Sequence, residues 1–168
     1  MTISMYAASV PVFRQILNSL SEILTKAEAH ATEKKIDPAA LLQARLFPDM
    51  FALTRQIQIA ADFAKGACAR LAGAEVPKYD DTEVGFADLR ARIAKTIAFI
   101  ESLPKENIDG SEAREIQTSA GPNSKTFVGQ AYLTHYALPQ FMFHATTAYN
   151  ILRHNGVEIG KRDFMGKF

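Results

Sequence analysis

Residues 143–166 read FHATTAYNILRHNGVEIGKRDFMG, and they contain the end of one long helix and the most distinctive polar side chain of the protein. Ala148 and Ile151 follow His144 at four and seven residues, so the three share one helical face. At Gly156 the chain can adopt the left-handed conformation that ends helices, and His154 then meets the negative end of the helix dipole. The stretch predicts an amphipathic helix that ends near His154 and turns the imidazole of His144 inward.

The rest of the chain repeats the helical pattern. Apolar residues recur at three and four positions, which is typical of amphipathic helices. Two β-prone pieces, REIQT and KTFVG, flank SAGPNS and predict a short hairpin. Asp37 is the expected cap of a short turn that starts at Pro38, and Pro139 is expected to kink the last helix. The long helices are predicted at about 9–34, 48–71, 82–103 and 129–154.

These elements predict an all-α fold, a four-helix bundle with a small β-hairpin inserted before the last helix. No repeat or linker divides the chain, so residues 1–168 are expected to form a single domain. On the third helix, Asp88 and Arg92 are expected on the solvent side. The C-terminal tail is expected to return across the end of the bundle through Phe164.

Composition excludes several classes of function. Lys and Arg number 19 against 18 Asp and Glu, so the chain lacks the basic excess of a nucleic-acid-binding protein. Charged or amide side chains interrupt every apolar segment, and we therefore expect no membrane span. Cys68 has no disulfide partner and the N-terminus lacks the pattern of a secretory signal, so a cytoplasmic location is expected.

His144 is the candidate site residue on which the functional hypotheses depend. Burying its imidazole without a hydrogen bond would cost about 1–3 kcal/mol, so it needs a partner. One interpretation is a core histidine satisfied by another side chain, and the other is a ligand-binding or metal-binding residue. Gln56 and Asp49 lie seven residues apart on one face of the second helix and are the candidate neighbours. Gln140 and Thr147, at four residues before and three after His144, do not complete a metal motif.

Three long phrases carry a family resemblance: SMYAASVPVFRQILNSL, LFPDMFALTRQIQIAADFAKGACARLAG and LPQFMFHATTAYNILRHNGVEIGKRDF. Together they resemble a bacterial family catalogued as domain of unknown function nineteen ninety-three, within the DinB/YfiT-like superfamily. The resemblance covers nearly the whole chain and implies a DinB-like four-helix bundle, commonly a homodimer. The superfamily is regarded as a group of metalloenzymes, and some members are thiol-dependent transferases whose divalent metal is held by three histidines.

The three-histidine set is not present in this sequence. The second helix contains no histidine, and His144 has none four residues away, so His144 alone could correspond to a metal ligand. The first hypothesis is a protein with a small-molecule pocket and a degenerate or absent metal site. The second is a divergent metal-dependent enzyme, thiol-transferase-like or hydrolytic, in which His144 and Asp49 or water hold nickel or zinc. The third is a structural homodimer without a ligand. The residues expected to line the pocket are His144, Gln56, Tyr149, Tyr132 and Asp49.

Overall fold

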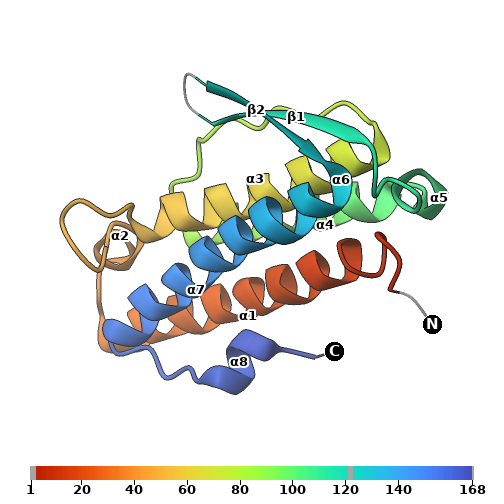
Figure 1. Ribbon diagram of the computed structural model, residues 1–168. Helices are drawn as coiled ribbons and strands as arrows, with labels where there is room; N and C mark the ends of the chain where they lie inside the picture. The colour runs from red at the N-terminus through yellow and green to blue at the C-terminus, as the bar shows by residue number, and fades with distance from the viewer. Residues whose placement is uncertain (1–2, 121–122, 168) are drawn as a thin grey trace.

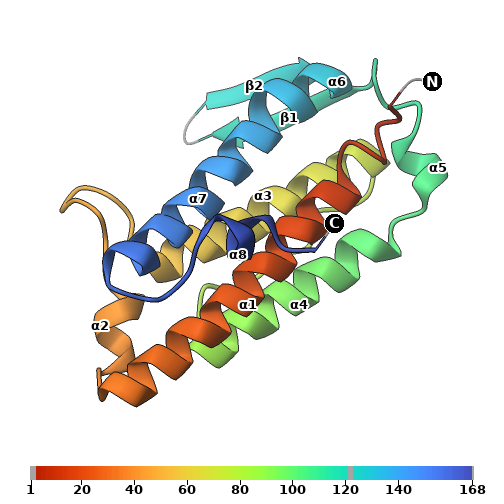
Figure 2. The same ribbon diagram turned by 90° about the horizontal axis from the view of Figure 1, so that it is seen from below.

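The long helices of the computed structural model pack side by side around one core (Figures 1 and 2), and the structure describes residues 3–120 and 123–167. Both α1 and α3 contact α4 as well as α7. The predicted mostly helical fold, with a hairpin before the last long helix, is confirmed. The long helices are α1 (Val10–Lys34), α3 (Leu53–Ala72), α4 (Phe86–Ser102) and α7 (Leu138–His154). The shorter elements are α2 (Pro38–Leu42), α5 (Lys105–Ile108), β1 (Glu115–Ala120), β2 (Asn123–Val128), α6 (Gly129–Ala131), the π-helix η1 (Tyr132–Ala137) and α8 (Lys161–Met165).

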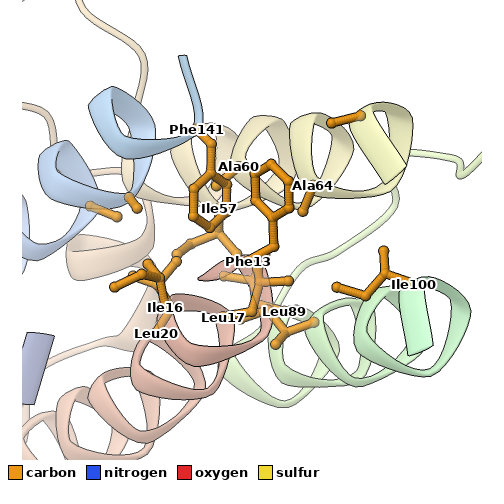
Figure 3. Close-up of a cluster of buried hydrophobic side chains, with 14 of the residues drawn as sticks. Phe13, Ile16, Leu17, Leu20, Ile57, Ala60, Ala64, Leu89, Ile100 and Phe141 are labelled. Carbon is orange, nitrogen blue, oxygen red and sulfur yellow. The ribbon is translucent and has the colours of Figure 1, made fainter. Parts of the chain in front are cut away.

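The core forms where the apolar stripes of the long helices meet (Figure 3). Phe13 of α1 and Phe141 of α7 are fully buried, and their rings meet edge to face with centroids 4.9 Å apart. The buried alanines of α3, including Ala60 and Ala64, are small and let its neighbours approach closely. Cys68 lies in the same interior, and burial raises the pKa of its thiol, so it is a core residue rather than a reactive one.

The second long helix starts later than predicted. The sequence placed its start near Pro48, but α3 begins at Leu53, whose backbone N–H donates to the carbonyl of Ala44. Residues 43–52 therefore form an irregular connection from α2, which extends past the start of α3 in Figure 1. The predicted cap at Asp37 is confirmed, because its carboxylate accepts from the Ala39 N–H at 2.9 Å.

The start of α4 also differs from the prediction. The sequence predicted a start near residue 82, whereas the helix begins after Gly85. The carboxylate of Asp88 reaches back and accepts from the backbone N–H groups of Val84 and Gly85 at 3.0 and 2.9 Å. The signal for this start lay in the side chain three residues inside the helix, not in the residue before it.

The predicted hairpin is confirmed as antiparallel β1 and β2, with Glu115 opposite Val128. Its Gly121-Pro122 turn lies outside the described residues. The hairpin covers the C-terminal part of α3 in Figure 1. At its end, a Cβ on Gly129 would overlap the carbonyl oxygen of Ser111, so only glycine fits there.

A π-helical turn precedes Pro139, where the sequence predicted a kink. Residues Tyr132–Ala137 form η1, and Pro139 lies in the first turn of α7. Proline provides no N–H and its ring crowds the preceding turn, and the wider π-turn just before it accommodates both effects. Such turns recur at functional sites, and this one ends at Ala137, about two helical turns before His144.

The end of α7 matches the prediction, but the tail takes a different path. Gly156 adopts φ 88° and Val157 is buried, as expected for a helix end. The tail does not cross the bundle end: α8 contacts α1 (Figure 2), and Asp163 pairs with Lys26 of α1 at 2.6 Å. Over the described residues, no helix combines the length and apolarity that crossing a bilayer requires.

Candidate functional site

The structure brings His144 and Gln56 together at the contact between α7 and α3. His144 is 8% exposed and Gln56 is 1% exposed. The Nδ1 of His144 lies 2.7 Å from Oε1 of Gln56. The Nε2 of Gln56 donates to the carbonyl oxygen of Phe51 at 3.0 Å, in the connection that precedes α3. Two helices and one connection thus meet at this pair.

These two hydrogen bonds determine the tautomer of His144. Because the amide nitrogen of Gln56 donates to Phe51, its Oε1 faces the imidazole as an acceptor. The Nδ1 of His144 must then carry the proton, and in the neutral ring the lone pair lies on Nε2. The Nε2 atom meets no hydrogen-bonding group in the described part of the chain, and it is not sealed from solvent. It is therefore free to accept a hydrogen bond from a ligand.

The environment of His144 favours the neutral ring. Burial lowers the pKa of His144, and the positive charge of Arg55 lowers it further. The rings of Phe63 and Phe143 flank it: Phe63 stacks at 6.0 Å between centroids and Phe143 lies edge-on at 5.3 Å. At neutral pH the site thus presents an uncharged acceptor between two aromatic rings.

A small hollow lies along α7 next to Phe143, whose ring contacts that of His144. Its volume is about 260 Å³. Gln140 lies four residues before His144, so the two side chains are neighbours on the helix surface. The ring of Phe143 borders both His144 and the hollow. The residues lining it are His135, Tyr136, Pro139, Gln140 and Phe143, from η1 and the first turns of α7.

The other three predicted pocket residues lie elsewhere. Tyr132 is buried, and its hydroxyl accepts a hydrogen bond from Arg70 at 3.2 Å. Tyr149 packs edge-on against Phe164 of the C-terminal tail, with centroids 5.7 Å apart. Asp49 is an exposed residue of the connection 43–52 and lies outside α3, whereas the sequence placed it on the second helix. In the described parts of the chain, none of the three forms a hydrogen bond or ring contact with His144.

The residues around His144 do not fit the metal site that the resemblance implies. Across residues 3–120 and 123–167, no three His, Cys, Asp or Glu side chains gather where they could hold an ion. The Oε1 of Gln56 is engaged by the imidazole itself. The hydroxyl of Thr147 donates to the carbonyl of Phe143 at 2.7 Å. Amides and hydroxyls are also poor ligands for zinc or nickel.

Sequence reasoning misplaced Arg92, which is buried rather than on the solvent side. It is 4% exposed, and its guanidinium binds Asp62 at 3.0 Å, Asp81 at 3.1 Å and Glu83 at 2.9 Å. Burial by itself would raise the pKa of Glu83. The hydrogen bonds from Arg92 and Gln58 have the larger combined effect, so the pKa of Glu83 is lowered. The pairing fastens residues 73–85, the connection between α3 and α4, onto both helices.

This ion-pair cluster reaches the neighbourhood of His144 through Arg55. Asp81 pairs with Arg55 as well as with Arg92. Beside the cluster, the ammonium groups of Lys65 and Lys95 lie 3.9 and 4.1 Å from the centre of the Tyr79 ring. The adjoining surface hollow of about 560 Å³ holds acidic and basic side chains together. Among its charged lining residues, Arg92 and Glu83 pair with each other at 2.9 Å.

Comparison with known proteins agrees with this fold. A crystal structure of a DinB family member protein from Shewanella denitrificans is similar to it with a TM-score of 0.87 and 43% sequence identity. The match covers 97% of this chain and 92% of that one. No curated protein matches the chain. The model of the family described as "Domain of unknown function (DUF1993)" matches residues 5–165. This chain therefore belongs to that family.

Proposed function

We propose that this protein is a DinB-like four-helix bundle that binds a small organic molecule at His144 without a metal ion. The observation that carries the proposal is the chain of hydrogen bonds from His144 through Gln56 to the carbonyl of Phe51. It makes Nε2 an acceptor, and the neighbouring Phe143 borders an aromatic hollow. Mainly apolar pockets with a few fixed polar groups are the usual sites for small molecules.

The size and lining of the hollow favour one class of ligand. At about 260 Å³ it lies just below the range of about 300–1,000 Å³ common for ligand pockets, so a single ring suits it. Tyr136 and Phe143 offer aromatic surface to a flat molecule. The lone pair of His144 requires a hydroxyl or N–H donor on that molecule. A phenol or an indole combines these features.

Paired probes test the donor requirement. Phenol and toluene would be titrated into uniformly ¹⁵N-labelled protein while the amide and imidazole signals of His144 are followed. Phenol should bind more tightly, because toluene leaves Nε2 without a donor. The preference should disappear in His144→Phe and persist in His154→Phe, a control at the far end of α7. Equal binding of both probes, or a preference that survives in His144→Phe, would contradict the proposal.

The metal-dependent alternative predicts a different result. In it, His144 joins water or a carboxylate in an open nickel or zinc site that supports thiol-transfer or hydrolytic chemistry. Calorimetric titration of untagged protein with each metal separates the two, because a polyhistidine tag would itself bind both. We expect no stoichiometric binding. Stoichiometric binding that is lost in His144→Ala would replace our proposal with the metalloenzyme.

A structural homodimer without any ligand is the remaining alternative. It predicts that neither phenol nor indole shifts the signals of His144, Phe143 or Tyr136 at any concentration. Shifts confined to the residues around the hollow would instead support ligand binding.

A further inference from the structure

Three cationic side chains lie around the ring of Tyr79, in the connection between α3 and α4. This connection, residues 73–85, runs back along α3 to the start of α4 (Figure 1). The ammonium groups of Lys65 and Lys95 lie 3.9 and 4.1 Å from the centre of the ring, and the guanidinium of Arg92 lies 5.6 Å from it. An aromatic ring attracts each cation, but cations gathered around one ring also repel one another. Anions close to them offset this repulsion.

Two of the three cations have their anion within the chain, and the third does not. Lys65 and Arg92 both pair with Asp62, at 2.8 and 3.0 Å. Lys95 forms no ion pair within residues 3–120 and 123–167. The ring of Tyr79 nevertheless holds its ammonium group in a defined position. Lys95 is therefore placed to receive an anion from solution.

A surface hollow opens beside these cations. Its volume is about 560 Å³, within the range of about 300–1,000 Å³ common for small-molecule sites. The connection 73–85 forms one side of it and the first turns of α4 form the other. The residues lining it include Lys78, Tyr79, Asp80, Arg92 and Lys95. We call it the α4 hollow.

The charges that line the α4 hollow leave a positive excess once the internal pairs are set aside. Arg92 and Glu83 pair with each other. The carboxylate of Asp88 accepts from two backbone N–H groups at the start of α4, at 3.0 and 2.9 Å. The remaining charged lining residues, which form no ion pair within the described parts of the chain, are Lys78, Asp80 and Lys95. Two ammonium groups thus stand against one carboxylate.

Arg92 adds a donor that has no acceptor. Its side chain is buried, and its Nε atom has no hydrogen-bond partner among the described residues. The terminal nitrogens of the same guanidinium bind Asp62 and Glu83, so Nε is the donor that the ion pairs leave over. Buried donors without a partner are uncommon in folded proteins. Because Arg92 lines the α4 hollow, an acceptor bound there can supply the missing hydrogen bond.

We propose that the α4 hollow binds the phosphate group of a small organic molecule. Lys78 and Lys95 neutralise the charge, and the Nε–H of Arg92 donates to a phosphate oxygen. A phosphate monoester carries about two negative charges at neutral pH and has three acceptor oxygens, which match two ammonium groups and one further donor. The volume of the hollow leaves room for the organic part. This site is separate from the hollow near His144 and does not depend on the proposed function.

The NMR signal of the Arg92 Nε–H tests the site directly. Glycerol 3-phosphate would be titrated into ¹⁵N-labelled protein, with chloride keeping the ionic strength constant. The Nε–H signal and the amide signals of residues 78–83 should shift along one saturating curve. Acetate should bind about tenfold more weakly, because a single charge neutralises only one ammonium group. An unchanged Arg92 signal, or equal binding of acetate, would overturn the proposal.

Inorganic phosphate separates the free ion from the ester. It should shift the same signals but bind more weakly than glycerol 3-phosphate, because it makes no contact through an organic part. Tighter binding of inorganic phosphate than of the ester would contradict the proposed class of ligand.

Charge variants test the assigned roles. Lys95→Met should weaken binding of glycerol 3-phosphate by about tenfold, because a charge-assisted contact is lost. Lys161→Met is the control, an exposed lysine of α8 outside the hollow, and should leave binding unchanged. Asp80→Asn should strengthen binding by about threefold, because it removes the carboxylate that repels the anion. Circular dichroism would establish that the variants remain folded. Weaker binding in Asp80→Asn, or equal losses in both lysine variants, would refute an anion site at the α4 hollow.

Discussion

At the scale of single residues, the contact of His144 with Gln56 explains why a polar side chain is stable on the apolar face of α7. Helical periodicity predicted that His144 points inward, and that it needs a partner. Gln56 could be named as a candidate neighbour because it lies near the apolar stripe of its own helix. The carbonyl of Phe51 could not be predicted, since it depends on where α3 begins.

Removing the acceptor should destabilise the protein. Gln56→Leu leaves the Nδ1–H of His144 buried without a partner and also releases the carbonyl of Phe51. We expect the free energy of unfolding to fall by about 1–3 kcal/mol in urea denaturation. Gln140→Leu is the control, a nearby glutamine on α7, and should change stability by less than about 0.5 kcal/mol. Equal effects would mean that the hydrogen bond contributes little.

The lowered pKa of His144 predicts how stability depends on pH. The unfolded histidine binds a proton near pH 6.5, whereas burial and Arg55 delay protonation in the folded protein to lower pH. As pH falls below about 6.5, the unfolded state therefore takes up the proton first, and the contribution to stability is lost down to the folded pKa. His144→Phe should flatten this part of the curve of unfolding free energy against pH. An unchanged slope would show that His144 titrates normally.

At the scale of elements, the irregular segments departed most from the sequence predictions. The burial of Arg92 was missed because its carboxylate partners lie outside its own helix, on α3 and in residues 73–85. A signal was present: Arg92 lies between Leu89 and Thr96 at three and four residues, on a face that proved buried. The π-turn before Pro139 was missed because a proline alone does not distinguish a kink from a wider turn.

Breaking the Arg92 cluster should loosen the connection between α3 and α4. Arg92→Met keeps an unbranched side chain but leaves Asp62, Asp81 and Glu83 without their shared partner. We expect a loss of about 2–3 kcal/mol in the free energy of unfolding, because two of the carboxylates keep access to water. Arg14→Met removes an ion pair exposed on both sides and should cost less than about 1 kcal/mol. A comparable loss in both variants would contradict the structural role of the cluster.

The junction of the hairpin with η1 should tolerate only glycine at position 129. Gly129→Ala places a methyl group against the carbonyl of Ser111. The backbone must shift to make room for this methyl group, which should lower the free energy of unfolding by about 1–3 kcal/mol. Gly160→Ala is a matched control, since its backbone is extended and nothing lies within 4 Å of the added methyl. Thermal unfolding of both variants checks this, and two equal melting temperatures would refute the close contact.

At the scale of the whole molecule, the sequence predicted the layout of the long helices better than the site between them. Each helix carries a periodic apolar stripe that needs no knowledge of its neighbours. The positions of Tyr132 and Tyr149 depended on the paths of Arg70 and of the tail that carries Phe164, and no local pattern encodes either path. The family likewise indicates the fold, while the proposed ligand site depends on the residues that this chain places around His144.

The protonation state of His144 is the central claim, and ¹⁵N NMR of its imidazole at neutral pH measures it most directly. The account predicts a neutral ring with a proton on Nδ1 and a free Nε2, unchanged when zinc or nickel is added at one equivalent. A charged ring, a proton on Nε2, or a shift of Nε2 that saturates at one equivalent of metal would contradict it.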